Sequence, residues 1–275
     1  MYNLGFIGGG NMSTAIARGI ITNDAHPVSK IWVSGPNLTT LKHWSEWGTN
    51  VTVQNSDIFY NCDIIFLGIK PGLLSTAIKE CLSDSTASLS QKNVLFVSML
   101  AGITIDRLQQ ELSTLSQNVS VVRIMPNTPM SVGAGACLYT PDQTVSSQQC
   151  ELLEKLLSNC GICEKVPESL INPLGALTAC GPAFIYVAIE ALADGAVKQG
   201  VPRQIAIRLA AQMVAGSGKM VVESGKHPGL LKDEVCSPGG STICGVTALE
   251  NGKLRATLIS AIEAATVRTK EIGKN

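Results

Sequence analysis

The sequence contains few charged, aromatic and histidine residues. Of its 275 residues, 15% are charged, 4% are aromatic and three are histidines, and the formal net charge is zero. No basic stripe favours nucleic-acid binding, and no unbroken run of about 18 apolar residues predicts a membrane span. The strand predicted from residue 3 leaves no room for a cleavable presequence. We therefore expect a cytosolic protein without nucleic-acid or membrane partners, with a mitochondrial location as the open alternative.

The nine cysteines predict neither disulfide bonds nor a metal site. Their number is odd and they are scattered along the chain, which is not the pattern of a disulfide framework. Cys160 and Cys163 form a C-x-x-C pair, but no second pair and no histidine lie at ligand spacing nearby. We expect reduced thiols that pack as small apolar side chains.

The pattern of apolar residues divides the chain into two halves. Strand-like runs alternate with polar or helical segments at residues 3–7, 30–34, 51–53, 63–69, 93–98 and 119–124. Such alternation predicts an α/β fold with a doubly wound parallel sheet. From about Ser169 onward the pattern is helical, at residues 183–199, 204–223, 241–251 and 254–272. These helices are apolar around most of their circumference, so we expect them to pair with a second subunit.

A glycine-rich turn follows the first predicted strand. Gly8 and Gly10 meet the G-x-G-x-x-G dinucleotide fingerprint, and Ser13 in the third position is small enough for close helix–strand packing. An unliganded turn is the alternative interpretation. The second strand ends at Ser34 without the acidic residue that usually marks NAD preference. The amide and hydroxyl side chains within residues 37–40 indicate NADP instead.

Two later strands end in turns with polar groups. Lys70 precedes Pro71 after the fourth strand, where a cation facing a cofactor is useful, and a solvated surface lysine is the alternative. Asn127 and Thr128 lie between two prolines after the sixth strand. They either offer amide and hydroxyl contacts to a ligand or only make the turn rigid.

The segment from Pro238 to Thr242 predicts a binding site built without ionisable side chains. Pro238 ends the preceding element, and two glycines allow a close approach to the backbone. Ser241 and Thr242 then lie in the first turn of an apolar helix, where free amides and hydroxyls favour a small anion. An ordinary helix cap is the alternative.

The sequence lacks the base that an alcohol dehydrogenase needs. None of the three histidines lies in a predicted strand-end turn, and the helix at 183–199 carries its only lysine, Lys198, at its far end. Reduction of a C=N bond requires fewer catalytic groups from the protein than oxidation of an alcohol does. The imine can arrive protonated and the cofactor brings the hydride, so the protein need only orient the substrate and stabilise charge.

Together these motifs resemble the pyrroline-5-carboxylate reductase family, which makes proline from a cyclic imine with NADPH or NADH. The matching segments follow the family order at residues 6–12, 70–71, 127–129, 179–184 and 237–250. The last of these is highly specific. The resemblance implies a Rossmann domain over residues 1–166 and a helical dimerisation and substrate-binding domain over 167–275. It also implies a homo-oligomer, either a dimer or a decamer of five dimers.

The resemblance also implies roles for individual residues. Thr242 would be catalytic, with its hydroxyl near the ring nitrogen of pyrroline-5-carboxylate. The substrate would be bound by Glu168, Ser237, Gly239, Gly240, Ser241 and Thr242. NADPH, or NADH, would be bound by Ile7, Gly8, Gly9, Gly10, Asn11, Met12, Gly35, Pro36, Asn55, Gly68, Ile69, Lys70, Pro71 and Ala101.

Two other functions remain open from the sequence. A reductase of the β-hydroxyacid type is disfavoured because no lysine base lies in the middle of the helix at 183–199. A cofactor-binding protein without catalysis is supported only by residues 176–180, which are bulkier here than in the family.

Overall fold

The computed structural model describes residues 2–82 and 92–273. By its internal contacts the chain forms two compact units. The first unit comprises Met1–Cys180 with Ala265–Asn275, and the second comprises Gly181–Ala264. The boundary predicted between residues 166 and 167 lies just before helix α7 (Glu168–Gly175), which belongs to the first unit.

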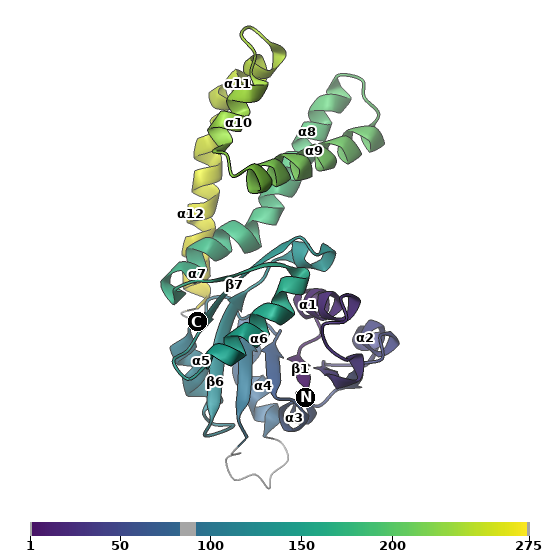
Figure 1. The fold of residues 1–275 in the computed structure, drawn as a ribbon, viewed down its shortest axis with the longest axis vertical. Helices are drawn as coiled ribbons and strands as arrows, with labels where there is room; N and C mark the ends of the chain where they lie inside the picture. Colours follow the sequence, from purple (N-terminus) through teal and green to yellow (C-terminus); the bar gives the residue numbers. More distant parts are fainter. Residues whose placement is uncertain (1, 83–91, 274–275) are drawn as a thin grey trace. The chain divides into compact units, whose positions relative to one another are not determined.

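The first unit is built on one eight-stranded sheet in the order β3-β2-β1-β4-β5-β6-β7-β8 (Figure 1). Its strands are β1 (Leu4–Ile7), β2 (Ile31–Ser34), β3 (Asn50–Thr52), β4 (Ile64–Leu67), β5 (Val94–Ser98), β6 (Val119–Met125), β7 (Gly135–Pro141) and β8 (Gly161–Lys165). Every neighbouring pair is parallel except β6 with β7. The predicted doubly wound sheet is confirmed for β1 to β6, whereas the sequence pattern does not predict β7 and β8.

Helices cover both faces of this sheet. They are α1 (Asn11–Thr22), α2 (Lys42–Glu46), α3 (Asn55–Asn61), α4 (Leu74–Cys81), α5 (Ile105–Leu112), α6 (Ser147–Leu157) and α7. Phe6 and Phe66 enter one apolar core with α1 and α6, and their rings stack 4.8 Å apart. Ile65 and Leu67 enter a second core with α3, α4 and α5. Because alternate residues are buried on opposite faces, β1 and β4 are apolar nearly throughout.

The strand order reverses at β1, which pairs with β2 on one side and with β4 on the other. In doubly wound sheets a ligand binds in the crevice beyond the carboxyl ends of the strands at such a reversal. The topology therefore predicts a ligand site among the residues that follow β1, β2 and β4.

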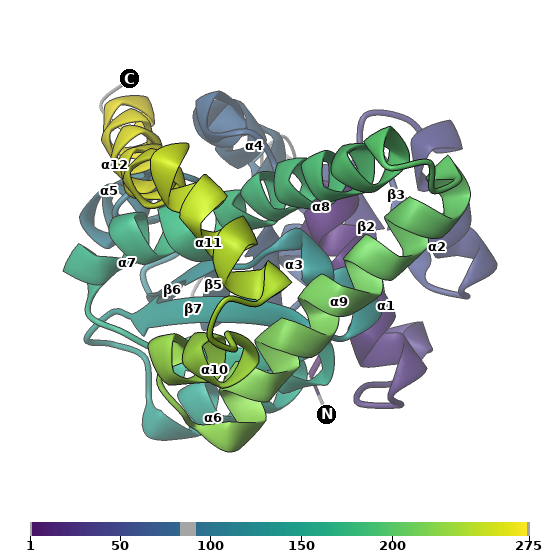
Figure 2. The ribbon, with the colours of Figure 1, turned by 90° about the horizontal axis from the view of Figure 1, so that it is seen from above.

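The second unit is helical throughout. Its helices are α8 (Gly181–Lys198), α9 (Arg203–Ser224), α10 (Pro228–Val235), α11 (Ser241–Asn251) and most of α12 (Leu254–Ile272). Helices α8 and α9 lie side by side (Figure 2). The four predicted helices are confirmed, and α10 is an addition to them.

Many apolar side chains of the second unit are exposed in the single chain. Val187 of α8 is 66% exposed and Val222 of α9 is 83% exposed. By length and composition alone, the helical segment Glu168–Lys198 and α9 are long and apolar enough to cross a membrane. The absence of an unbroken apolar run therefore does not exclude membrane contact. The same exposure is typical of helices whose apolar faces pack against another subunit.

Candidate functional site

The turn after β1 can be made only with glycine. Gly8 has a φ of +96°, and a Cβ placed on it would lie 2.6 Å from the carbonyl oxygen of Gly68. The Gly8 amide donates to the Ser34 carbonyl at 3.0 Å, and the Gly68 amide donates to the Ile7 carbonyl at 2.8 Å. The ends of β1, β2 and β4 are thus held together at the point where the strand order reverses.

Helix α1 begins at this turn with an uncapped amino end. Its N-cap is Gly10, and no side chain accepts a hydrogen bond from the first-turn amides. A Cβ on Gly10 would meet nothing within 4 Å, so the space in front of the helix is open. Buried Ser13 packs closely under Gly68, where an added Cβ would lie 2.1 Å from Ser13 Oγ. The expected close packing is confirmed, and the free amides fit a phosphate group.

A cavity of about 370 Å³ opens beside this turn. It is lined by Ile7, Gly8, Gly35, Pro36, Val53, Asn55, Ile69, Leu73, Thr76, Ala77 and Glu80. Six of these residues are among those predicted to bind the cofactor. The volume lies within the roughly 300–1,000 Å³ of typical small-molecule sites. The apolar walls and open backbone of this cavity fit the adenosine half of a dinucleotide, and the free amides of α1 follow Gly8 by three residues.

The other predicted cofactor residues do not line this cavity. Gly9 and Gly10 complete the turn after β1, and Asn11 and Met12 begin α1. Gly68, Lys70 and Pro71 belong to the turn after β4, and Ala101 follows β5. Lys70 is exposed.

Two polar residues of the cavity, Asn55 and Glu80, form a hydrogen-bonded chain with Ser34, which does not line it. Ser34 Oγ donates to Asn55 Oδ1 at 2.6 Å, and Asn55 Nδ2 donates to Glu80 Oε2 at 2.5 Å. Ser34 is fully buried at the end of β2. The sequence gives no signal for Glu80, because only the packing of α4 against α3 brings it to Asn55.

The loop after β2 holds the side chains from which NADP use was inferred. Asn37 Oδ1 accepts from the Thr40 amide at 3.0 Å, and Thr40 Oγ1 donates to the Asn37 carbonyl at 2.9 Å. These bonds form a compact turn that is exposed to solvent. A role of this turn in binding a 2′-phosphate stays a prediction.

Glu168 begins α7 and is held by two donors in the first unit. Its Oε1 accepts from the Ile105 amide at 2.8 Å and from Arg123 Nη1 at 3.0 Å. Arg123 also donates to Asn172 Oδ1 at 2.7 Å. Burial lowers the pKa of Arg123, while the hydrogen bond and charge of Glu168 act in the opposite direction. The signal for this network was an arginine in an otherwise apolar strand, since a buried charge needs a partner.

The predicted substrate segment lies in the second unit, between α10 and α11. Gly239 has a φ of +64°, and the Gly240 amide donates to the Ser237 carbonyl at 3.1 Å. Helix α11 begins at Ser241 with Gly240 as N-cap and with no side chain capping it. Thr242 is half-buried in its first turn. The predicted geometry of a tight turn before a helix with free amides is confirmed.

Asn127 has a structural role in the turn after β6. Its Nδ2 donates to the Thr178 carbonyl at 3.1 Å, and its Oδ1 accepts from the Ala136 amide at 2.9 Å. Both ends of the amide are used within the first unit, which favours the rigid-turn interpretation of this motif.

The cysteines give no sign of a redox or metal centre. All nine are free thiols. Burial raises the pKa of Cys160 in the C-x-x-C pair to about 11, so this thiol stays protonated at neutral pH. Within residues 2–82 and 92–273, no group of three or more His, Cys, Asp or Glu side chains is placed to hold a metal ion.

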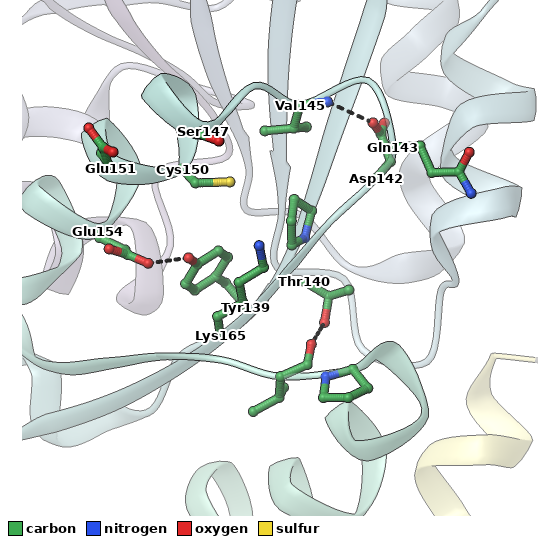
Figure 3. A pocket seen from close by; sticks show the side chains of 13 residues that line it. Tyr139, Thr140, Asp142, Gln143, Val145, Ser147, Cys150, Glu151, Glu154 and Lys165 are labelled. Atoms are coloured by element: carbon green, nitrogen blue, oxygen red, sulfur yellow. Dashed lines mark hydrogen bonds between the residues drawn. The ribbon is translucent and has the colours of Figure 1, made fainter.

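A larger cavity of about 680 Å³ lies between β7, β8 and α6, at the edge of the sheet (Figure 3). Two of its polar side chains, Tyr139 and Thr140, donate hydrogen bonds within the lining. Tyr139 donates to Glu154, and Thr140 Oγ1 donates to the Val166 carbonyl at 2.6 Å. None of the predicted site residues lines it. We therefore place the functional site at the strand reversal rather than in the larger cavity.

The chain is similar to known proteins over nearly its whole length. Residues 168–272 match the family model described as pyrroline-5-carboxylate reductase dimerisation, and residues 3–102 match the one described as NADP oxidoreductase coenzyme F420-dependent. Pyrroline-5-carboxylate reductase 3 of Danio rerio is 43% identical over 270 residues, which cover 98% of this chain and 91% of that protein.

Solved structures agree with these matches. A pyrroline-5-carboxylate reductase from Coxiella burnetii superposes with a TM-score of 0.87 at 34% identity, covering 100% of this chain and 99% of that one. The Plasmodium falciparum pyrroline carboxylate reductase with NADP bound gives a TM-score of 0.84 at 30% identity, covering 99% and 98%.

Proposed function

Because this chain belongs to the pyrroline-5-carboxylate reductase family, we propose which of its residues carry out the reduction. The chain is an NADP-dependent oxidoreductase that converts pyrroline-5-carboxylate to proline. The observation that carries the residue assignments is the cavity at the strand reversal, which is lined by six predicted cofactor residues.

The cofactor residues divide by the part of the dinucleotide that each would hold. The first-turn amides of α1, at Asn11 and Met12, suit the pyrophosphate, because they are uncapped and lie at the positive end of the helix. Gly35, Pro36 and Asn55 suit the adenosine ribose, since they line the cavity at the end of β2. The residues after β4 and Ala101 after β5 would line the remainder. When bound, NADPH supplies the hydride.

The substrate residues would bind an anion and a ring nitrogen without an ionisable base. The free amides at the start of α11 suit the carboxylate of pyrroline-5-carboxylate. The Thr242 hydroxyl would hydrogen-bond the ring nitrogen and hold the imine in place while its carbon is reduced. Electrons of the C=N bond then return to a nitrogen that already carries a proton. Glu168 would lie close to the substrate, in an orientation that Arg123 fixes.

The chain forms homo-oligomers through its helical half, as the dimerisation family match indicates. A dimer, or a decamer of five dimers, would cover the exposed apolar faces of α8 and α9 with other copies of the chain rather than with lipid. We further propose a cytosolic location. It is supported by nine free cysteines, which are typical of a reducing compartment.

The function is tested by the oxidation of NADPH with three additions in parallel: pyrroline-5-carboxylate, a panel of hydroxy acids, and no substrate. We expect NADPH oxidation when pyrroline-5-carboxylate is added, and none with the hydroxy acids or without substrate. Turnover of a hydroxy acid would indicate a β-hydroxyacid-type reductase, and NADPH binding without any turnover would indicate a protein that has lost catalysis.

A further inference from the structure

A carboxylate on α4 lines the cavity of about 370 Å³ beside the turn after β1. Glu80 lies in the last turn of this helix and lines the cavity together with Gly35 and Pro36. Asn55 links it to the end of β2, because its amide donates to Glu80 at 2.5 Å and accepts from Ser34 at 2.6 Å. Two hydrogen bonds through Asn55 thus link the Glu80 carboxylate to Ser34, the last residue of β2.

The end of β2 is the place where doubly wound folds recognise the 2′ position of the adenosine ribose. An acidic residue near the end of β2 usually accepts a hydrogen bond from the 2′-hydroxyl of NAD. This chain has Ser34 and Gly35 at that place. Glu80 brings a carboxylate to the same region from α4, a different element of the fold.

The charge of this carboxylate distinguishes the two nicotinamide cofactors. A carboxylate can accept from a ribose hydroxyl, but it repels a 2′-phosphate. The carboxyl end of α4 adds partial negative charge of the same sign. None of the residues that line the cavity is basic, so the lining offers no cation to a 2′-phosphate.

We propose that Glu80 is a specificity-determining residue that limits the preference of this enzyme for NADPH over NADH. The inference rests on the proposed function, in which the adenosine half of the cofactor occupies this cavity. The hydroxyl-rich turn at residues 37–40 favours the 2′-phosphate and Glu80 opposes it. The balance between them lets one site accept both cofactors.

The test measures binding rather than turnover. Two ligands that differ only in the 2′-phosphate, ADP-ribose and 2′-phospho-ADP-ribose, are titrated calorimetrically into the wild-type protein and into Glu80→Gln. The glutamine keeps the side-chain length and an acceptor for Asn55 but removes the charge. Because Glu80 is exposed, solvent screens its charge. We expect the ratio of the two dissociation constants to shift by about 3- to 10-fold towards the phosphorylated ligand, and less at about 0.5 M salt.

Two further variants separate charge from position. Glu80→Ala should shift the ratio in the same direction as Glu80→Gln, and Glu151→Gln, which removes an exposed carboxylate elsewhere in the first unit, should leave it unchanged. An unchanged ratio in Glu80→Gln, or an equal loss of affinity for both ligands in both Glu80 variants, overturns the proposal. If the folded wild type binds neither ligand, the proposed cofactor site itself is wrong, and the inference is overturned with it.

Discussion

Arg123 Nη1 donates to Glu168 Oε1 at 3.0 Å, and the arginine side chain is only 2% exposed. The pair joins β6 to the first residue of α7, and the Ile105 amide at the start of α5 adds a second donor to the same oxygen. A residue predicted from family resemblance to lie near the substrate is therefore also part of the internal framework of the first unit. Its position depends on a partner that no sequence motif contains.

Removing the partner should destabilise the first unit. In Arg123→Met, Glu168 loses its counter-ion and Asn172 loses a donor, and breaking such a pair with one buried member costs about 2–4 kcal/mol. Urea unfolding followed by tryptophan fluorescence measures this loss, since all three tryptophans lie in the first unit. Lys42→Met, which breaks the exposed pair with Glu46, is the matched control and should cost less than about 1 kcal/mol. If both substitutions lower the free energy of unfolding equally, the Arg123–Glu168 pair contributes no more than an exposed ion pair.

Two neighbouring glycines should respond differently to alanine. Gly8→Ala forces a side chain into a positive φ and against the Gly68 carbonyl, so it should destabilise the protein by more than about 2 kcal/mol. Gly10→Ala meets no protein atom within 4 Å and should cost less than about 1 kcal/mol. Its methyl group instead projects where the cofactor is expected, so NADPH affinity should fall at least about tenfold. Unchanged NADPH affinity in Gly10→Ala would place the pyrophosphate elsewhere.

Thr242→Val should slow the reaction without weakening cofactor binding. Loss of a hydrogen bond that acts during charge change costs about 2–4 kcal/mol, which lowers kcat/KM by roughly 30- to 1,000-fold. Thr247→Val is the control on the same helix, because the Thr247 hydroxyl only donates to the Ile243 carbonyl at 2.9 Å. A near wild-type rate in Thr242→Val would mean that the hydroxyl only stabilises the start of α11.

The apolar faces of the second unit predict that the chain does not function as a monomer. Val222→Asp places a charge on α9 at an 83% exposed position and should dissociate the oligomer and abolish activity. Val132→Asp, at a 78% exposed position of the first unit, should leave assembly intact. Light scattering measures the mass of each variant. A folded, active monomer of the wild type at micromolar concentration contradicts this prediction.

The parts of the fold that the sequence predicts are those with a local signal. The glycine turn at Gly8, the buried strands β1 to β6 and the four long apolar helices all have a period or a turn residue that marks them. Strand β8 has only five residues, three of them polar or glycine, and forms because β7 offers it a pairing edge. The sequence does not predict helix α10, because its eight residues are bounded by loops and show no strong apolar period.

The candidate site also contains residues with a local sequence signal and residues without one. Residues that belong to motifs, such as Gly8 and Asn11 after β1 and Gly240 before α11, could be predicted from type and spacing. Glu80 has no such signal, and Arg123 indicates a buried charge without indicating its partner, because helix packing brings the two residues to partners 25 and 45 residues away. Long-range electrostatic partners of a site therefore require the folded structure.

The most direct test of the assigned reaction follows the hydride itself. The wild-type protein is incubated with pyrroline-5-carboxylate and NADPH carrying deuterium at the transferable position of the nicotinamide, and the proline formed is analysed by mass spectrometry. We expect proline that is one mass unit heavier, with the deuterium on the carbon of the former C=N bond and none transferred without enzyme. Absence of labelled proline from folded protein that binds NADPH would contradict the assigned reaction.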